Sequence, residues 1–550
     1  MLRNVLKYQK GIFFFLTLIT GVLIFSCFGN FQYALSQGDH GRDLYAFKRV
    51  LDGAVPYRDF SWLFGPLMAY YYALFFKVFG VSVQSVILGQ DILIILTGIG
   101  LFLACTRFLT PAFSFLCAFW YWALRGDEFF YTYNHSGGLL CQVMMVYALF
   151  SYIKTARLRY VIGGLVVAFL FSLIRVNMAM ALLVPWCAAL AVTDIVRREP
   201  ALLLRLRVNV YGALLCAGMA FLVYAWYFQG QSAYVLWESF PLSKAQRAEP
   251  AVSPWLAMGM ALRHYVPFFL TTWVGRVITI ACVLSVGGMV FNFLSRRNFG
   301  GREKTDSLLA VVFTMILAMA GAHEYLLSSV AYRVYWVFPL LLILIFLIFG
   351  LATRHGRWQA FFRRILYIVL WGVAMLTLAG QWRDVAWLKT NGYVFKYGAN
   401  EVYTRQEAQW FSTVRAACDF IEKNVPPGQK LFTLPFDTLY NYLTGRDQPT
   451  RQWVFFEHFH MPPEQDIATI HDLERNKVVW VLVSSRSIDQ EPGLGVFGRD
   501  YCRVLCDYID KNYQAQVQFG VWNPAPSWAW NHGVVFFKRK TPFANHAAAK

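Results

Sequence analysis

Residues Gly38–Gly80 read GDHGRDLYAFKRVLDGAVPYRDFSWLFGPLMAYYYALFFKVFG and lie between the first two long apolar segments of the chain. This stretch combines acids, bases and aromatic side chains at a density that a simple connector between two membrane helices does not need. Its acids are Asp39, Asp43, Asp52 and Asp59, and its bases include Arg42, Lys48, Arg49 and Arg58. The pattern predicts a built site beside a membrane. The plainer alternative is a solvated loop whose charges cap helices.

The composition of the whole chain indicates a polytopic membrane protein. Of its 550 residues, 57% are hydrophobic and 15% are charged, whereas about a quarter of the residues are charged in a soluble domain. Apolar runs long enough to cross about 30 Å of hydrocarbon recur through the first two-thirds of the sequence. A soluble enzyme with so many unbroken apolar runs would be insoluble.

The apolar runs predict about eleven membrane-spanning helices. We interpret the first, Gly11–Phe28, as an uncleaved helix rather than a signal peptide, because no small-x-small cleavage site follows it. The other predicted spans are Val83–Ala104, Thr110–Leu124, Gly138–Ile153, Tyr160–Leu173, Met178–Thr193, Val208–Phe228, Val266–Phe293, Leu308–Ala322, Val334–Leu351 and Ile365–Gln381.

The distribution of basic residues predicts the orientation of these spans. Lys and Arg gather in alternate connections, as the positive-inside rule requires of cytoplasmic loops. The basic residues of Met1–Lys10 place the N-terminus inside, and a count of eleven spans then places Gly38–Gly80 and everything after Gln381 outside. The net charge of +19 is explained by these inner loops. It forms no basic patch with stacking aromatics, so the sequence predicts no nucleic-acid partner.

A change of composition near Tyr393 predicts a second domain. We expect a transmembrane domain over residues 1–392, with an outer loop at 34–82, and an extracytoplasmic α/β domain over 393–550. Short apolar runs alternate there with helical patterns. The expected helices are Phe411–Asn424, Thr438–Leu443, Gln465–Asn476 and Arg499–Asn512, and the expected strands are Lys430–Leu434, Val478–Ser484 and Val534–Lys538.

Cysteine and histidine spacing predicts no metal site and no cofactor, with a divalent metal left as an open alternative. Most of the ten cysteines lie in or beside apolar runs, and the sequence does not reveal the pairing of Cys418, Cys502 and Cys506 in the tail.

The order of residues within Gly38–Gly80 resembles the first outer loop of the GT-C class of membrane glycosyltransferases. That loop reads roughly D-E-x-x-Y, then a leucine-glycine pair, Pro-Leu and Phe-Gly. One position departs from the pattern, because the second acid of the class is His40 here, and the next acid, Asp43, follows about one helical turn on. The matching residues are Asp39, Tyr45, Ala46, Leu51, Gly53, Pro56, Tyr57, Gly65, Pro66, Leu67, Tyr70, Phe79 and Gly80.

The resemblance implies an inverting glycosyltransferase of the bacterial inner membrane. The class includes the protein O-mannosyltransferases and the aminoarabinose transferase that acts on lipid A. Its members move a sugar from a polyprenyl-phosphate carrier to an acceptor on the outer face, which here would be a lipid, a glycan or a protein. The resemblance makes Asp39 the general base. Asp43 would orient Asp39, bind the acceptor or cap the helix that follows.

Polar residues of other outer connections are candidate substrate ligands. Arginine suits a phosphate because its planar fork donates two parallel hydrogen bonds. For Arg175 and Arg333 the alternative is snorkelling from a helix end to the interface. The candidate phosphate ligands are Arg58, Arg175 and Arg333, and the other candidate substrate contacts are Asp127, Glu128, Asn134, His135 and His323.

Two other functions compete with a transferase. A flippase or transporter of a lipid-linked sugar predicts related halves and polar groups near the membrane midplane. In this sequence only Asp91 lies deep in an apolar run, and the other acids gather at one surface. A scaffold for envelope assembly, with the tail as its binding module, is the weaker rival.

Overall fold

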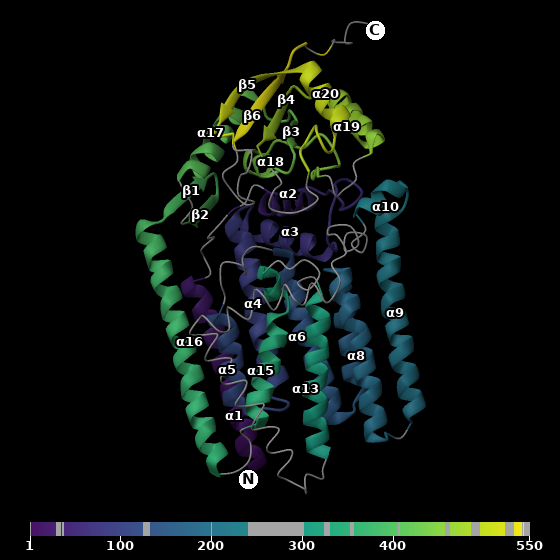
Figure 1. The fold of residues 1–550 in the computed structure, drawn as a ribbon, viewed down its shortest axis with the longest axis vertical. Coiled ribbons are helices and arrows are strands. Elements are labelled where there is room, and N and C mark those ends of the chain that lie inside the picture. Colours follow the sequence, from purple (N-terminus) through teal and green to yellow (C-terminus); the bar gives the residue numbers. More distant parts are fainter. Residues whose placement is uncertain are drawn as a thin grey trace.

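The computed structural model describes residues 2–28, 35, 38–124, 133–199, 201–239, 302–323, 331–352, 357–404, 408–456, 462–485, 495–522, 533–541 and 543. These residues form a tall bundle of helices with an α/β region at one end, and the N-terminus lies at the opposite end (Figure 1).

The helices of the bundle follow from the apolar runs of the sequence. Within the described residues, seven helices are long and apolar enough to cross a membrane. Each predicted span except Val266–Phe293 coincides with a described helix. That span lies outside the described residues, so the count of eleven stays a prediction. The helices are α1 (Leu2–Phe28), α4 (Val83–Cys105), α5 (Pro111–Ala123), α6 (Tyr133–Thr155), α7 (Leu158–Ser172), α8 (Val176–Arg197), α9 (Leu202–Phe228), α13 (Arg302–Gly321), α15 (Phe338–Ala352) and α16 (Arg357–Asn391).

Two helices from the first outer stretch, α2 (Asp39–Leu51) and α3 (Leu67–Phe79), lie between the bundle and the α/β region (Figure 1). In α3, Tyr72 and Phe76 are buried, whereas Leu74 and Val78 are exposed. This division is typical of a helix that rests in the membrane interface. A short helix α10 (Ala233–Ser239) lies near the same level (Figure 1), and a 3₁₀ helix η2 (Ala331–Trp336) precedes α15.

The α/β region is built on a four-stranded sheet of order β3-β4-β6-β5, in which β3 and β4 are parallel and the other pairs are antiparallel. A separate hairpin joins α16 to this region. The strands are β1 (Tyr393–Tyr397), β2 (Asn400–Thr404), β3 (Leu431–Leu434), β4 (Trp480–Ser484), β5 (Tyr513–Phe519) and β6 (Val534–Arg539). The helices are α17 (Ala408–Asn424), α18 (Leu439–Thr444), α19 (Pro463–Arg475) and α20 (Arg503–Asn512).

Helices cover both faces of this sheet, because alternate strand residues point to opposite sides. The ring of Trp480 lies 5.3 Å from that of Phe420 on α17. Val481, the next residue, packs in a second core with Leu473 of α19 and Leu505 of α20. Figure 1 shows α17 on one side of the sheet and α19 and α20 on the other.

The expected helices and strands of the tail are confirmed, with differences at α20 and in three strands. Helix α20 begins at Arg503 rather than Arg499, because residues before it form a turn in which Asp500 accepts a hydrogen bond from the Val496 amide at 2.8 Å. The hairpin β1–β2 and the strand β5 were not predicted. Strand β5 has glutamine at alternate positions and pairs on one side only, so it lacks the apolar pattern of a buried strand.

The α/β region docks directly on α2. A Cβ atom at Gly41 would lie 2.6 Å from the Leu439 backbone nitrogen, so the first turn of α2 approaches α18 as closely as a glycine permits. The Tyr45 hydroxyl accepts a hydrogen bond from the Gln448 amide at 2.8 Å. The ring of Phe60 stacks on Trp453 at 4.6 Å. The outer stretch is therefore held between the bundle and the tail.

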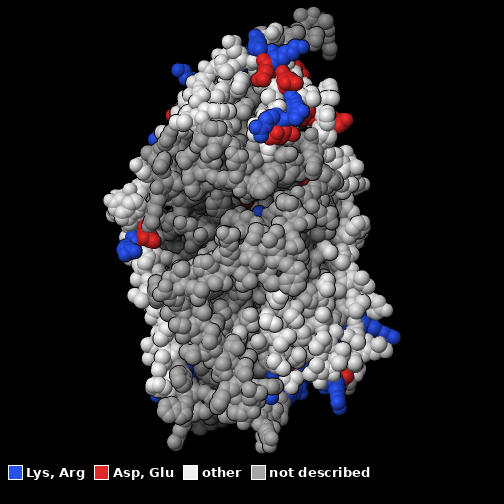
Figure 2. Space-filling model, viewed as in Figure 1, with Lys and Arg blue, Asp and Glu red and all other residues white. Residues whose placement is uncertain are grey.

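On the face drawn in Figure 2, charged side chains are few on the described flank of the bundle. Figure 2 shows Lys, Arg, Asp and Glu gathered on the α/β region and Lys and Arg at the far end, with few on the described flank between them. This distribution fits a bundle whose flank faces lipid.

Candidate active site

The first turn of α2 brings two carboxylates and one guanidinium group together. Arg42 Nη1 lies 3.0 Å from Asp39 Oδ1, and Arg42 Nη2 lies 2.8 Å from Asp43 Oδ1. The helix accounts for the Asp39–Arg42 pair, since residues three apart lie on one face, and it places Asp43, four residues after Asp39, on that face too. The side chain of Asp39 is 24% exposed, whereas that of Asp43 is 3% exposed. Asp39 is therefore the carboxylate that a ligand can reach.

Asp43 is held from two directions. Besides the Arg42 contact, Asn134 at the start of α6 donates from Nδ2 to Asp43 Oδ2 at 2.9 Å. Burial raises the pKa of Asp43 from 3.8 to about 6, with the nearby Asp39 acting in the same direction and Arg42 opposing it. Asp43 thus fixes the position of Arg42, which in turn contacts Asp39.

Aromatic rings enclose Arg42 from both layers of the protein. Its guanidinium carbon lies 4.9 Å from the ring centre of Phe64, in the loop before α3, and 5.5 Å from that of Phe436, after β3 in the α/β region. A cation above an aromatic face is attracted by the ring quadrupole, more strongly where water is excluded. Arg42 is only 5% exposed, so both rings contribute.

A backbone contact places Phe64 beside the bundle. The Gly65 amide donates to the Ile174 carbonyl at 2.9 Å, and the Leu67 amide donates to the Leu173 carbonyl at 2.9 Å. A Cβ atom at residue 65 would lie 2.1 Å from the Leu173 oxygen, so only glycine fits. The Gly65-Pro66-Leu67 part of the motif therefore docks the outer loop next to Arg175.

A second group of cations also packs on Phe64. The Arg175 guanidinium carbon is 5.5 Å from the Phe64 ring and 5.1 Å from Trp336. Arg175 Nη1 also contacts His135 Nε2, and the His135 ring stacks on Trp336 at 3.9 Å. Arg333 lies over the same indole at 5.4 Å. Three arginines are thus interleaved with rings from four separate segments.

The structure brings most of the predicted site residues into this one cluster: Asp39, Asp43, Asn134, His135, Arg175 and Arg333. His323 lies beside it, with Nε2 3.4 Å from Nδ2 of Asn177 on α8. Arg58 lies apart, half exposed and paired with its neighbour Asp59 at 3.1 Å. Asp127 and Glu128 fall outside the described residues.

Sequence reasoning assigned no role to Arg42, Phe64, Trp336 or Phe436. The position of Arg42 was readable, since it follows Asp39 by three residues and adjoins Asp43. Phe436 carried no signal, because its contact depends on the docking of a distant part of the chain. In the described part of the chain, no group of three His, Cys, Asp or Glu side chains could hold a metal ion.

Solved structures share this arrangement of helices and α/β region. The chain is similar to ArnT from Cupriavidus metallidurans in the apo state, with a TM-score of 0.55 and 13% sequence identity over 95% of this chain and 97% of that chain. The same protein bound to undecaprenyl phosphate gives a TM-score of 0.54 and 12% identity over the same shares. The chain has the GT-C fold.

The GT-C fold confirms the fold class predicted from Gly38–Gly80. A third structure, the oligosaccharyltransferase of Archaeoglobus fulgidus in complex with Zn and sulfate, matches with a TM-score of 0.46 and 12% identity over 85% of this chain and 68% of that chain. No protein-family model and no curated protein sequence matches the chain. The fold and the helix content make it a multi-pass membrane protein.

Proposed function

We propose that this protein is a GT-C glycosyltransferase that transfers a monosaccharide from a polyprenyl-phosphate donor to a hydroxyl-bearing acceptor. The observation that carries the proposal is the cluster at the end of the membrane bundle. The partly exposed carboxylate of Asp39 contacts Arg42, and the Phe64 ring contacts both Arg42 and Arg175. Its fold neighbour ArnT has been solved with undecaprenyl phosphate, which supports a polyprenyl-phosphate carrier for this chain too.

In the proposed reaction, the acceptor hydroxyl attacks the anomeric carbon of the donor sugar. The bond between that carbon and the phosphate oxygen breaks, and the polyprenyl phosphate leaves with the bonding electrons. Asp39 takes the hydroxyl proton as general base. A positioned base of this kind contributes about 10²–10⁴-fold to rate. Attack from the face opposite the phosphate inverts the anomeric configuration.

Arg175 and Arg333 hold the phosphate in this scheme. Negative charge grows on the phosphate as the sugar departs, and guanidinium groups fixed in place stabilise such charge without reorganising. Both arginines pack on Trp336, and Arg175 also on Phe64, so their orientations are set before the donor arrives. His135 and Asn134 complete the wall between the phosphate ligands and the carboxylates.

The placement of the site suggests where the two substrates meet. The cluster lies where α2 and the α/β region cover the end of the bundle. A lipid-borne donor can reach that level from the membrane, and a water-borne or lipid-borne acceptor from the other side. The positive-inside rule supports an extracytoplasmic location for this end, and the proposal therefore has the α/β region outside the inner membrane.

Donor binding tests the phosphate ligands. Arg175→Ala and Arg333→Ala are each expected to weaken binding of a polyprenyl phosphate by about 10-fold or more, because a hydrogen bond to a charged group contributes about 1.5–3 kcal/mol. Lysine should restore only part of the affinity, since it lacks the planar fork. Arg58→Ala is the matched control. Unchanged affinity in both alanine variants would leave snorkelling as the better account of these arginines.

The activity itself is tested with labelled polyprenyl-phosphate sugars and the purified full chain in vesicles. We expect label to move from the donor to an added membrane-extract acceptor. A chain that moves the intact donor across the bilayer, and never breaks the sugar–phosphate bond, would instead be a transporter.

A further inference from the structure

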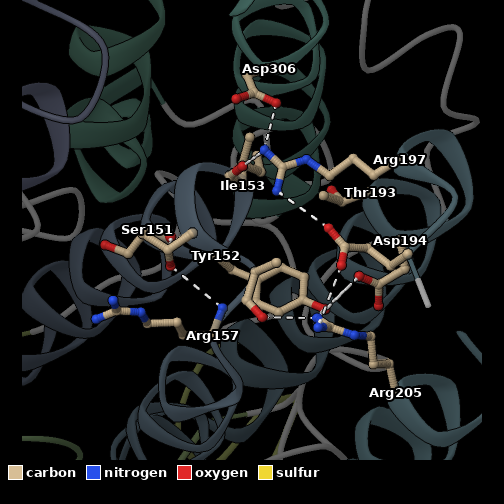
Figure 3. Close-up of polar contacts among 12 residues, drawn as sticks. Ser151, Tyr152, Ile153, Arg157, Thr193, Asp194, Arg197, Arg205 and Asp306 are labelled. Carbon is tan, nitrogen blue, oxygen red and sulfur yellow. Dashed lines mark hydrogen bonds and ion pairs between the residues drawn. The ribbon is translucent and has the colours of Figure 1, made fainter. Parts of the chain in front are cut away.

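The end of the bundle away from the α/β region holds two polar clusters. In the first, shown in Figure 3, acids balance the arginines. Arg197 lies 2.6 Å from Asp306, and Arg205 lies 3.8 Å from Asp194 and 3.5 Å from Glu199. This network joins the end of α8 to the starts of α9 and α13. Each of its two arginines is paired with a carboxylate, so no unpaired cation of this network calls for an anion.

The second cluster has a different composition, and we name it the Arg107 cluster: Lys10, Arg107, Tyr147, Arg159 and Tyr160. Arg107 Nη2 donates to the Tyr147 hydroxyl at 2.7 Å and to the Tyr160 hydroxyl at 3.4 Å. Arg159 Nη2 donates to the same Tyr160 hydroxyl at 3.0 Å. Lys10 of α1 comes close enough to interact electrostatically with Arg107 and Tyr160. Three cations from three separate segments therefore converge on two phenols.

No acid neutralises this convergence within the described part of the chain, where no carboxylate forms an ion pair with Lys10, Arg107 or Arg159. The Arg107 Nε atom is buried and has no hydrogen-bond partner among the described residues. The positive-inside rule accounts for basic residues in these connections. It does not explain why Arg107 and Arg159 both donate to the Tyr160 hydroxyl. Like charges held this close indicate that an anion completes the site.

The surroundings of the cluster identify the kind of anion. Beyond Lys10, α1 exposes Ile12 and Phe15, which are 50% and 61% exposed. Beyond Tyr160, α7 exposes Ile162 and Val166, which are 58% and 53% exposed. Such apolar side chains on a bundle flank face acyl chains. The site thus offers cations at the membrane surface and an apolar surface beneath them.

We propose that the Arg107 cluster binds the phosphate of an anionic phospholipid, with the lipid's acyl chains along the exposed faces of α1 and α7. Basic pockets between helices at the membrane surface recognise anionic head groups in this way. Guanidinium groups supply paired donors to the phosphate oxygens, and the tyrosine hydroxyls hold those groups in place. This site is separate from the one that carries the proposed function and does not depend on it.

Native mass spectrometry of the full chain in a non-ionic detergent tests the proposal. Phosphatidylglycerol, phosphatidylethanolamine and inorganic phosphate are titrated separately. We expect phosphatidylglycerol to bind the parent chain most tightly. Arg107→Gln and Lys10→Gln should each weaken it about fivefold, since one basic residue near an anionic surface contributes about 1 kcal/mol. Arg207→Gln is the matched control, because Arg207 is exposed at the same end of the bundle on α9.

Each other outcome overturns the assignment. If phosphatidylethanolamine binds as tightly as phosphatidylglycerol, the site does not require a net negative charge on the lipid. Inorganic phosphate that competes at the same concentration as the lipid would make this a site for a free anion. Equal losses of phosphatidylglycerol affinity in Arg107→Gln and Arg207→Gln would show that the general surface charge, and not the Arg107 cluster, attracts the lipid. If Arg107→Gln does not fold, Lys10→Gln and the head-group comparison on the parent chain still decide.

Discussion

Replacing Asp43 by asparagine separates the negative charge of this carboxylate from its hydrogen bonds to Arg42 and Asn134. The substituted side chain can still accept from Arg42 through Oδ1. Its amide can donate to Asn134 once the Asn134 amide turns over, because Asn134 Oδ1 is buried with no partner among the described residues. The substitution therefore removes charge and keeps hydrogen bonds. Because burial raises the pKa of Asp43, its charge lowers the stability of the folded state above that pKa, and we expect Asp43→Asn to unfold at or above the parental temperature at pH 7.

The activity should fall although the stability does not. Without the charge of Asp43, Arg42 is no longer shared between two carboxylates and pairs with Asp39, the proposed base, alone. We expect the transfer rate to fall about 10–100-fold, by analogy with the cost of misplacing a catalytic group by about 1 Å. The matched control is Asp59→Asn, which removes a partly exposed carboxylate from the same stretch, where an ion pair contributes about 0–1 kcal/mol.

A charge swap provides the decisive comparison. The double variant Asp43→Asn with Asn134→Asp restores the buried charge one hydrogen bond further from Arg42. At pH 7 the double variant should unfold at a lower temperature than Asp43→Asn, because it again buries a charge, while sugar transfer stays low because the carboxylate no longer touches Arg42. Parental transfer by Asp43→Asn would refute the positioning role. A double variant as stable as the single one would refute the charge argument.

The pH dependence gives an independent view of Asp43. Its pKa in the folded protein is raised from 3.8 to about 6, so between those values the folded state binds more protons than the unfolded chain. The contribution of this group to stability therefore decreases as pH rises across that window. Transfer should move in the opposite direction and increase through about pH 6 as Asp43 ionises. In Asp43→Asn this step in the rate profile should be absent.

Two further predictions concern the loop and the topology. Gly65→Ala should lower both folded yield and transfer, because its Cβ would lie 2.1 Å from the Leu173 oxygen and overpacking costs about 1–3 kcal/mol. The control Gly163→Ala should be tolerated, because no atom lies within 4 Å of the added carbon. Equal folded yield and transfer in the two variants would contradict the docking of the motif. Alkaline phosphatase fused to the C-terminus should be active and green fluorescent protein fused there should be dark; the reverse would place the α/β region in the cytoplasm and overturn the orientation of the site.

The sequence predicted the parts of the fold that depend on local pattern. Apolar run length located the spans, and the short apolar run Val478–Ser484 located the central strand, which the structure has at Trp480–Ser484. It missed β5, although Gln514, Gln516 and Gln518 alternate with apolar residues, which is the pattern of a half-buried strand. This strand was therefore readable from the sequence, whereas its pairing with β6, which follows later in the chain, was not.

The sequence predicted site residues where a residue departed from the usual pattern of its segment or belonged to a motif. Arg175 drew attention because a base at an outer helix end opposes the positive-inside bias, and Asp39 because it opened a motif. The aromatic rings broke no rule, since aromatic residues are common near membrane interfaces. Phe436 in particular meets Arg42 only because α18 docks on Gly41, a tertiary contact that neither segment encodes alone. Contacts between distant segments, such as that of Phe436 with Arg42, cannot be predicted from local sequence patterns.

Sugar transfer by Asp39→Asn is the most direct test of the central claim that Asp39 is the general base. Asparagine keeps the size of the side chain and one acceptor for Arg42 Nη1, but it cannot take a proton. Label transfer from a polyprenyl-phosphate sugar is measured together with the yield of folded protein in detergent. We predict a rate about 10²–10⁴-fold below the parent at a similar folded yield, since Asp39 is partly exposed. Transfer at the parental rate by the folded variant would contradict the account and move the base to another residue.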